Sequence, residues 1–243
     1  MLYLKISHQI KEQVLTRPIG VLYEDESFIA FDKPAGLLVI ATAKQKERTL
    51  LSIVNQQFQS PSFHLHLCHR LDRETSGVIL FAKGKRGQKL MMDVFKRRQV
   101  RKKYIAFVQG RLPSASGELK SFILDDQERK YRKDAASKWA VTRYKILETR
   151  KYFSVAEVEP VTGRTNQIRI QFSQMRHPLV GERKYAFARD YKIKFRRTAL
   201  HALSLEWKHP LTGKMIKIEA PLAKDMEEFL ISQQGGNSAR NRN

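Results

Sequence analysis

The sequence predicts an α+β fold: a mixed, mainly antiparallel central sheet with flanking helices and loops. Predicted strands outnumber predicted helices, because most apolar segments are short and bounded by turn residues. Two pairs of strands follow each other so closely that each pair is expected to form a hairpin. A chain of 243 residues, 42% of them hydrophobic, is long enough to bury a substantial core.

The first half of the chain contains two strand-like and two helix-like segments. Residues 28–31 predict a strand that ends in the Pro- and Gly-containing turn 32–36. The uninterrupted apolar run 78–81 predicts a buried strand. Apolar residues at helical spacing predict helices over 49–58 and 83–99.

The second half is richer in strands. The predicted strands are 104–110, 139–147, 152–158, 203–208 and 215–220. Strands 139–147 and 152–158 are expected to form one hairpin, and strands 203–208 and 215–220 another. A helix is predicted to begin near Thr162 and to run to Met175, and a second one covers 224–232. We expect residues 1–20 to be a lead-in, 21–232 to be one folded domain, and 233–243 to be a disordered basic tail.

Charge is the second informative property. The chain carries 46 Lys and Arg residues against 24 Asp and Glu, a formal net charge of +22. Such an excess is expected of a protein that binds a phosphate backbone. An anionic membrane surface and simple solubility are the alternatives, but no isolated amphipathic anchor is visible. Nucleic acid is therefore the favoured partner, and no obligate protein partner is predicted.

The expected location is the cytoplasm. No stretch approaches the roughly 18 consecutive apolar residues of a membrane span, and the N-terminal residues lack the layout of a signal peptide. The single cysteine, Cys68, excludes an intrachain disulfide and fits a reducing compartment.

The segment His69-Arg70-Leu71-Asp72-Arg73-Glu74-Thr75-Ser76-Gly77 is the most specific feature of the chain. It places the Asp72 carboxylate among cationic side chains directly before a buried strand. In a strongly basic protein this pattern predicts a catalytic acid, base or nucleophile that acts on nucleic acid. The alternative is a structural aspartate that caps a turn and pairs with Arg70 or Arg73.

A strongly basic segment follows this motif. Ten basic residues and one acid, Asp93, lie between Lys83 and Lys103. We expect this segment to track the phosphates of a nucleic acid, with a solvated helix face as the alternative. The residues expected to bind phosphates are Lys83, Lys85, Arg86, Lys89, Arg97, Arg98, Arg101 and Lys102.

The imidazole and thiol groups of 64–69 could also suggest a metal site. Alternation with Leu places His64, His66 and Cys68 on one face of an extended segment. No second ligand cluster lies at a recognised spacing, so no metal site is predicted.

The His69–Gly77 segment resembles the signature of the RluA-type pseudouridine synthases. Further segments resemble that family's motifs in the same order: Asp32-Lys33-Pro34-Ala35-Gly36, Lys103-Tyr104-Ile105-Ala106, Thr162-Gly163-Arg164-Thr165-Asn166-Gln167-Ile168-Arg169, His177-Pro178-Leu179-Val180-Gly181, Leu200-His201-Ala202 and His209-Pro210-Leu211-Thr212-Gly213. The resemblance runs from about residue 21 to 222.

This resemblance implies that uridine in structured RNA is isomerised to pseudouridine without a cofactor. Asp72 would perform the covalent or proton-transfer step, and Arg169 would pair with it so that the carboxylate stays ionised. Tyr104 would stack on the target base. A phosphate contact is the alternative for Arg169, and core or edge packing is the alternative for Tyr104.

The resemblance also implies roles in holding the RNA. Arg70 is expected to fill the gap left by the extracted uridine, because a base inside RNA structure cannot otherwise reach the carboxylate. Arg164 is expected to bind RNA, and Leu200 to form an apolar wall of the pocket or only to pack. With about 20 residues before the match, an S4 RNA-binding domain is expected to be absent, so the basic surface must position the RNA.

Two positions depart from the family pattern. Asn166 stands where a histidine is usual, and Glu182 stands where an aspartate follows His-Pro-Leu-Val-Gly. Both departures put in doubt the local hydrogen bonds that orient the helix carrying Arg169. The RNA is expected to be ribosomal or transfer RNA. The alternatives from other classes are a non-catalytic RNA-binding or ribosome-assembly protein on the same fold, and a DNA-binding module.

Overall fold

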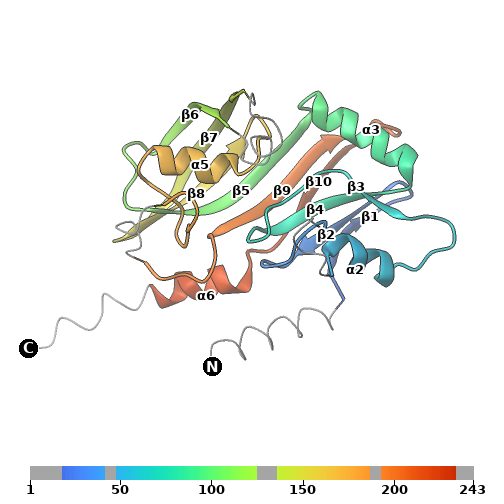
Figure 1. Cartoon of the computed structure of the whole chain (residues 1–243), viewed down its shortest axis with the longest axis horizontal. Helices are drawn as coiled ribbons and strands as arrows, with labels where there is room; N and C mark the ends of the chain where they lie inside the picture. Colours follow the sequence, from blue (N-terminus) through green and yellow to red (C-terminus); the bar gives the residue numbers. More distant parts are fainter. Residues whose placement is uncertain (1–17, 42–47, 125–135, 187–192, 234–243) are drawn as a thin grey trace, which may run out of the picture.

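The computed structural model describes residues 18–41, 48–124, 136–186 and 193–233 (Figure 1). Their strands form a single mixed sheet with the order β1-β2-β4-β9-β5-β8-β7-β6, in which β10 also pairs with β9 and β3 with β4. The strands are β1 (Val21–Glu24), β2 (Phe28–Lys33), β3 (Leu65–Leu67), β4 (Ser76–Lys83), β5 (Val100–Gln109), β6 (Ser116–Ile123), β7 (Lys138–Thr149), β8 (Phe153–Pro160), β9 (Leu200–Lys208) and β10 (Met215–Glu219). The helices are α2 (Leu50–Gln57), α3 (Lys85–Lys96), α5 (Gln167–Gln174) and α6 (Lys224–Ser232).

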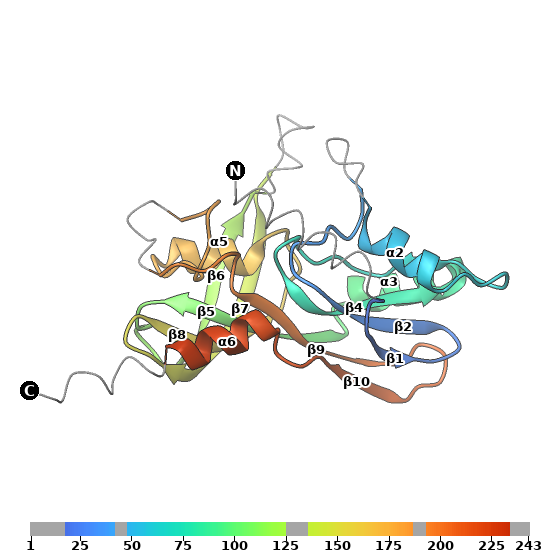
Figure 2. The same ribbon diagram turned by 90° about the horizontal axis from the view of Figure 1, so that it is seen from below.

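The sheet consists of two halves that meet where β4 lies beside β9. All strand pairs are antiparallel except this one, which is parallel and comprises the pairs Ser76↔His201 and Gly77↔Ala202. Figure 2 shows β1, β2 and β4 on one side of this parallel joint and β5–β8 on the other. Gly77 has φ +101°, and a Cβ there would lie 2.2 Å from the Ala202 carbonyl oxygen. Only glycine therefore permits this approach of the two backbones.

The helices cover both faces of the sheet. In the first half, α2 packs with Ile29 and Ile79, whereas α3 packs with Ala30 and Leu80, which point to the opposite face. Such two-sided burial explains why β2 and β4 are continuous apolar runs. The α2 helix begins at a capping box in which Thr49 and Ser52 bond reciprocally.

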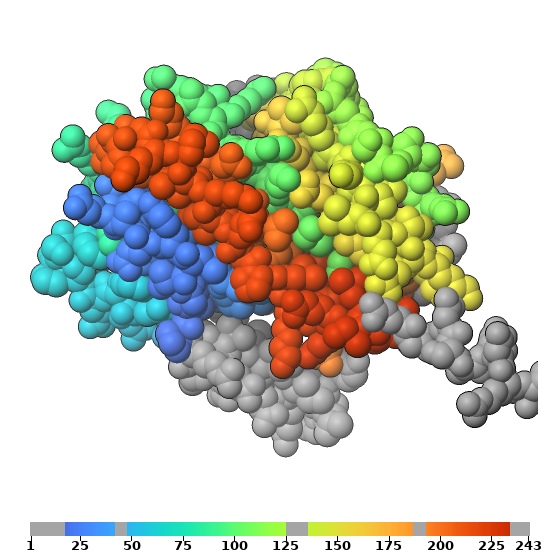
Figure 3. All heavy atoms as spheres, turned by 180° about the vertical axis from the view of Figure 1, so that it is seen from behind, coloured from blue at the N-terminus to red at the C-terminus, as the bar shows by residue number. Residues whose placement is uncertain are grey.

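In the second half, α5 and α6 lie on opposite faces. Ile168 and Phe172 of α5 belong to the same core cluster as the buried residues of α2. Met226 of α6 packs against Phe107 and Phe153 on the other face, and Figure 3 shows α6 and β10 (red and orange) on the side of the molecule away from the viewer of Figure 1.

The predicted α+β fold is confirmed, with corrections to several elements. The strand predicted from Tyr104 begins at Val100, and the helix predicted from Thr162 begins at Gln167, because residues 162–166 form a turn. Strands β1, β3 and β6 were not predicted as such. The tail from 234 onwards and residues 1–17 of the predicted lead-in lie outside the described residues. Ile19, at the end of that lead-in, is buried, and its backbone bonds with Gln57.

None of the helices in the described ranges combines the length and apolar character needed to cross a bilayer.

Candidate active site

A cleft of about 1180 Å³ lies between the two halves of the sheet. The His69–Thr75 segment and α3 line it from one half, and the turn 160–166 and the start of α5 line it from the other. Arg70, Asp72, Tyr104, Arg164, Arg169 and Leu200 all border this cleft. The fold therefore collects residues that are up to 130 positions apart in the sequence.

The loop that carries Asp72 rests on a buried lysine. Lys33, fully buried at the end of β2, donates from Nζ to the carbonyl oxygens of Pro34, Arg73 and Thr75 at 2.9, 3.0 and 2.7 Å. Burial, and then the Arg197 charge, lower the pKa of Lys33 to about 7. The three carbonyl oxygens match the three donors of an ammonium group, so this lysine fixes the backbone on both sides of Glu74.

His69 ties the other end of the loop to the sheet. Its Nε2 accepts the backbone N–H of Leu80 at 3.0 Å, and its ring packs against Phe95 of α3. Burial, and then the charge of Lys102, lower the pKa of His69 to about 3. The imidazole is therefore neutral and acts as an acceptor, which is a structural role.

Asp72 forms an ion pair with Arg169 across the cleft. The distance from Asp72 Oδ2 to Arg169 Nη1 is 3.3 Å, and the Asp72 side chain is 28% exposed, so a ligand in the cleft can reach it. Glu182 binds the same guanidinium more closely, with Nε–Oε2 and Nη2–Oε1 distances of 2.6 and 2.8 Å. Arg169 is thus oriented by the buried Glu182 and presents its remaining nitrogen to Asp72.

The electrostatics of the Arg169–Glu182 pair keep both of these side chains charged. Burial lowers the pKa of Arg169, but the hydrogen bonds and charge of Glu182, and then Asp72, raise it above its ordinary value. Burial raises the pKa of Glu182, but Arg169 and the backbone amides of Lys184 and Tyr185 bring it below its ordinary value. Arg169 therefore places a positive charge beside Asp72, which suits a carboxylate that acts as a nucleophile or general base.

Asn166 and Glu182, the two departures from the family pattern, both bind Arg169. Asn166 adopts a left-handed conformation with φ 55°, which asparagine tolerates better than most residues. Its Oδ1 accepts from Arg169 Nη1 at 2.8 Å, while its Nδ2 donates to the Tyr185 hydroxyl at 3.0 Å. The residues present therefore supply hydrogen bonds that orient the guanidinium.

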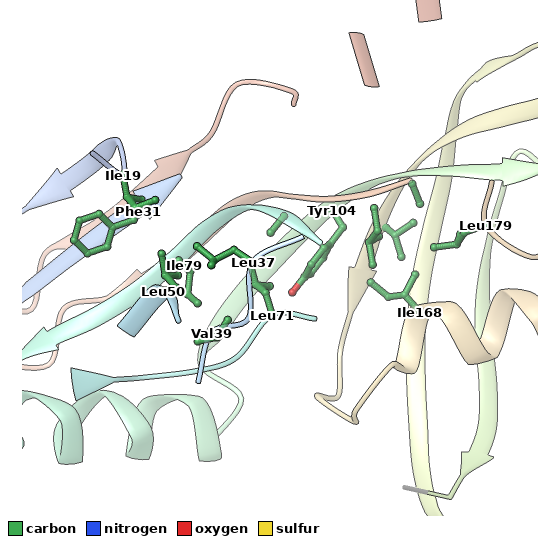
Figure 4. Close-up of a cluster of buried hydrophobic side chains, with 14 of the residues drawn as sticks. Ile19, Phe31, Leu37, Val39, Leu50, Leu71, Ile79, Tyr104, Ile168 and Leu179 are labelled. Atoms are coloured by element: carbon green, nitrogen blue, oxygen red, sulfur yellow. The ribbon is translucent and has the colours of Figure 1, made fainter. Parts of the chain in front are cut away.

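Tyr104 lies in the middle of the core beside Asp72. Figure 4 shows its ring with Leu37 and Leu71 on one side and Ile168 on the other, and its hydroxyl directed toward the Leu71 side. The residue is 9% exposed and borders the cleft. Burial, and then the Asp72 charge, raise the pKa of Tyr104, so its hydroxyl stays protonated. The ring contributes to the core and also forms part of the cleft wall.

The buried Gln167 shapes the turn that precedes α5. Its Oε1 accepts from the Thr162 hydroxyl at 2.7 Å and from the Arg164 N–H at 3.0 Å, and its Nε2 donates to Val141 and Thr142. This glutamine was not predicted as a site residue. The sequence feature that could have indicated its role is its position inside the Thr162–Arg169 motif, next to the residues expected to bind RNA.

The basic residues of 83–103 separate into two sets. Those that line the cleft are Lys85, Lys89, Lys96, Arg98 and Lys102. Lys83 instead pairs with Glu24 at 2.6 Å, Arg97 pairs with Asp93 at 3.2 Å, and Arg101 pairs with Glu159. Arg86 is exposed and is not among the residues that line the cleft. Lys96 was not predicted, although its spacing from Lys85 and Lys89 places all three on one helix face.

Leu200 begins β9 and is 4% exposed. Beside it, the buried Arg197 donates to the carbonyl oxygens of Glu74 and Leu200 and forms two bonds with Asp225 of α6. Arg197 thereby joins the Asp72 loop to β9, and sequence reasoning did not single it out.

Across the described residues, His, Cys, Asp and Glu side chains form no group that could hold a metal ion. The arrangement can provide an ionised carboxylate at the floor of a cationic cleft, beside an aromatic ring.

Comparison with known proteins identifies the family. Residues 27–174 match the family described as RNA pseudouridylate synthase. The chain is 33% identical over 241 residues to ribosomal large subunit pseudouridine synthase D of Xanthomonas campestris pv. campestris, covering 92% of this chain and 71% of that protein. It is 34% identical over 236 residues to tRNA pseudouridine synthase C of Haemophilus ducreyi, covering 89% of this chain and 96% of that protein.

Solved structures share the fold. Human RNA pseudouridylate synthase domain containing 4 superposes with a TM-score of 0.74 at 24% identity, over 95% of this chain and 98% of that one. The family match over residues 27–174 includes the Asp72 loop and all of α5. The chain therefore belongs to the RNA pseudouridylate synthase family.

Proposed function

We propose that this pseudouridine synthase isomerises uridine in ribosomal or transfer RNA and that Asp72 is its catalytic carboxylate. The observation that carries the proposal is the Asp72–Arg169 ion pair at the floor of a cleft lined with basic side chains. Curated relatives named as ribosomal and transfer RNA enzymes support this substrate class.

The chemistry follows from the groups in the cleft. Isomerisation breaks the bond between N1 of uracil and the ribose, turns the base, and joins carbon 5 to the same sugar carbon. Carbon 5 then loses its proton and N1 gains one, so the reaction balances without a co-reactant. An ionised Asp72 can begin this sequence as a nucleophile or as a base. Arg169 stabilises the carboxylate, Tyr104 stacks on the base, and Leu200 forms an apolar wall. Each role suits the position of the residue at the border of the cleft.

The RNA approaches along the basic walls. Lys85, Lys89 and Lys96 of α3 face Arg164 across the cleft, and phosphates on both sides of the uridine would neutralise them. Arg70 is exposed at the cleft border and is placed to occupy the gap left by the extracted base.

No cofactor or protein partner takes part in the proposed reaction. Cys68, a lone buried thiol, suits a reducing compartment and hence the cytoplasm.

The substitution Asp72→Asn tests the proposal. The amide keeps the shape of the side chain but loses its charge, so tritium release from RNA labelled at carbon 5 of uridine should fall by at least about a thousandfold, or 4 kcal/mol in the barrier. RNA affinity and thermal unfolding should change little. Turnover within about tenfold of wild type would exclude Asp72 as the catalytic group. Complete inactivity of the wild-type protein on ribosomal and transfer RNA would favour the non-catalytic RNA-binding alternative.

A further inference from the structure

An exposed aromatic pair lies at one end of the β6–β7 hairpin. Phe122 and Trp139 are direct cross-strand partners, with ring centroids 5.0 Å apart and planes at 63°. They are 61% and 45% exposed. Their neighbours in the strands, Ile123 and Ala140, point to the other face and are buried. We call Phe122 and Trp139 the aromatic patch.

Folding alone does not account for this patch. The two rings take no part in the core on the α5 side of the hairpin. Rings that stay exposed to water contribute little burial free energy to folding. Exposed apolar groups that touch each other are a common mark of a binding surface. A second copy of the chain is a poor occupant, because β6 ends the sheet and carries Glu118 and Lys120 on the same face as Phe122. Charges on an edge strand oppose pairing between sheets.

The patch adjoins the cleft through the backbone of β7. Arg164, which lines the cleft, donates from Nε to the Trp139 carbonyl oxygen at 3.3 Å. The amides of Val161 and Thr162 bond to the carbonyl oxygen of Val141, two residues further along β7. Only the β7 backbone at Trp139 separates Arg164 from the rings, so a strand of RNA that leaves the cleft past Arg164 and crosses the end of β7 would meet the aromatic patch.

The charge around the patch suits an anionic partner. Lys120 and Arg143 share the single carboxylate of Glu118, at 2.7 and 2.9 Å. With Arg164 on the cleft side, three cationic side chains stand against Glu118, and Glu159, the cross-strand partner of Arg143, is paired with Arg101. Aromatic rings interleaved with cations are the arrangement by which proteins bind unpaired nucleotides, with bases on the rings and phosphates on the cations.

We propose that the aromatic patch is a second RNA subsite, on which unpaired nucleotides flanking the target uridine stack. This inference rests on the proposed function, because it takes RNA to be the ligand of the cleft. The patch contributes affinity and not chemistry, since the side chains of Phe122 and Trp139 point away from the cleft face of the sheet.

Tryptophan fluorescence provides a direct test. The chain has two tryptophans; Trp207 is 1% exposed, whereas Trp139 is 45% exposed. A stem-loop RNA with a single-stranded tail of about eight uridines should quench the emission of the wild-type protein. The Trp139→Phe variant should lose this quenching and keep its affinity, because phenylalanine still offers a ring. Quenching that survives in Trp139→Phe would overturn the proposal.

Affinity measurements complete the test. Against the tailed RNA, Phe122→Ala/Trp139→Ala should weaken binding by about fivefold to a hundredfold. It should leave unchanged the affinity for the same stem-loop without its tail. The slope of log affinity against log salt should also be unchanged, because no cation is removed. Tyr152→Ala is the matched control, since Tyr152 is 54% exposed at the opposite end of the β7–β8 hairpin.

Other outcomes would contradict the subsite. Equal losses with tailed and trimmed RNA, an equal loss in Tyr152→Ala, or an oligomer that dissociates on Phe122→Ala/Trp139→Ala would each overturn it. Thermal unfolding and the single-turnover rate at saturating RNA should match wild type in the double variant. The quenching and affinity readouts do not require turnover, so they can support the subsite even if Asp72→Asn shows that the proposed catalytic role is wrong.

Discussion

Lys33 Nζ lies 2.7 Å from the carbonyl oxygen of Thr75, so a buried lysine side chain holds the loop that presents Asp72. In the folded protein, burial lowers the pKa of Lys33 to about 7, from an ordinary value of 10.5. Between these two values the unfolded chain binds one proton more than the folded protein. The free energy of unfolding should therefore rise with pH across this window.

The comparison with Lys33→Met isolates this effect. The free energy of unfolding of wild type minus that of the variant should increase by up to about 1.4 kcal/mol per pH unit between pH 7 and 9. Urea unfolding at a series of pH values measures it. A difference that is independent of pH would show that the three carbonyl acceptors keep Lys33 protonated throughout the range.

Glu182→Gln should slow catalysis without loss of RNA affinity. The amide leaves Arg169, whose side chain is 12% exposed, without its closest counter-charge. We expect kcat to fall about tenfold or more with KM within about threefold of wild type, and the free energy of unfolding to fall by about 3 kcal/mol. Glu182→Asp, which retains the charge, should recover part of both. Normal kcat in Glu182→Gln would mean that Asn166 alone orients Arg169.

The two faces of α3 should differ in their effect on RNA binding. Lys89→Gln/Lys96→Gln removes two charges that line the cleft, whereas Arg86→Gln/Arg97→Gln removes two that do not. The first variant should reduce the salt slope of log affinity by roughly 1.4 to 1.8 and raise KM. The second, with the same change in net charge, should leave both nearly unchanged. Equal effects would mean that only overall charge matters.

Gly77→Ala should destabilise the parallel joint between β4 and β9. Its Cβ would lie 2.2 Å from a carbonyl oxygen, and its φ of +101° is unfavourable for alanine. We expect a loss of at least about 3 kcal/mol in the free energy of unfolding. Gly20→Ala is the control, because nothing lies within 4 Å of a Cβ there. A loss of less than 1 kcal/mol in Gly77→Ala would show that the joint can widen.

The sequence predicted the fold class because its signals were local. Strands β2 and β4 are uninterrupted apolar runs, and the helical spacing of 49–58 is plain. Strand β6 was missed because its exposed Glu118 and Lys120 reduce its apolar content. The α5 helix begins later than predicted because Gln167 binds the preceding turn and also the distant strand β7, and periodicity does not reveal such contacts.

The candidate site was partly visible in the motifs. Asp72 was predicted from its residue pattern and from the family resemblance, whereas Tyr104 and Arg169 came from the resemblance alone, and the structure places all three at one cleft. The side chains that hold them, Lys33 and Arg197 among them, act through backbone carbonyl oxygens. Contacts between a side chain and backbone carbonyl oxygens depend on the tertiary structure. They leave no characteristic residue spacing in the sequence.

The parallel joint between β4 and β9 has a mechanical consequence. The loop before β4 carries Asp72, while α5, packed on β6, β7 and β8, carries Arg169. A change in twist at the two residue pairs of this joint, Ser76↔His201 and Gly77↔Ala202, therefore moves the Asp72 carboxylate relative to the Arg169 guanidinium. Cleft width and ion-pair length are geometrically linked, so substitutions in distant strands that flatten or coil the sheet will alter the reaction rate without touching the RNA.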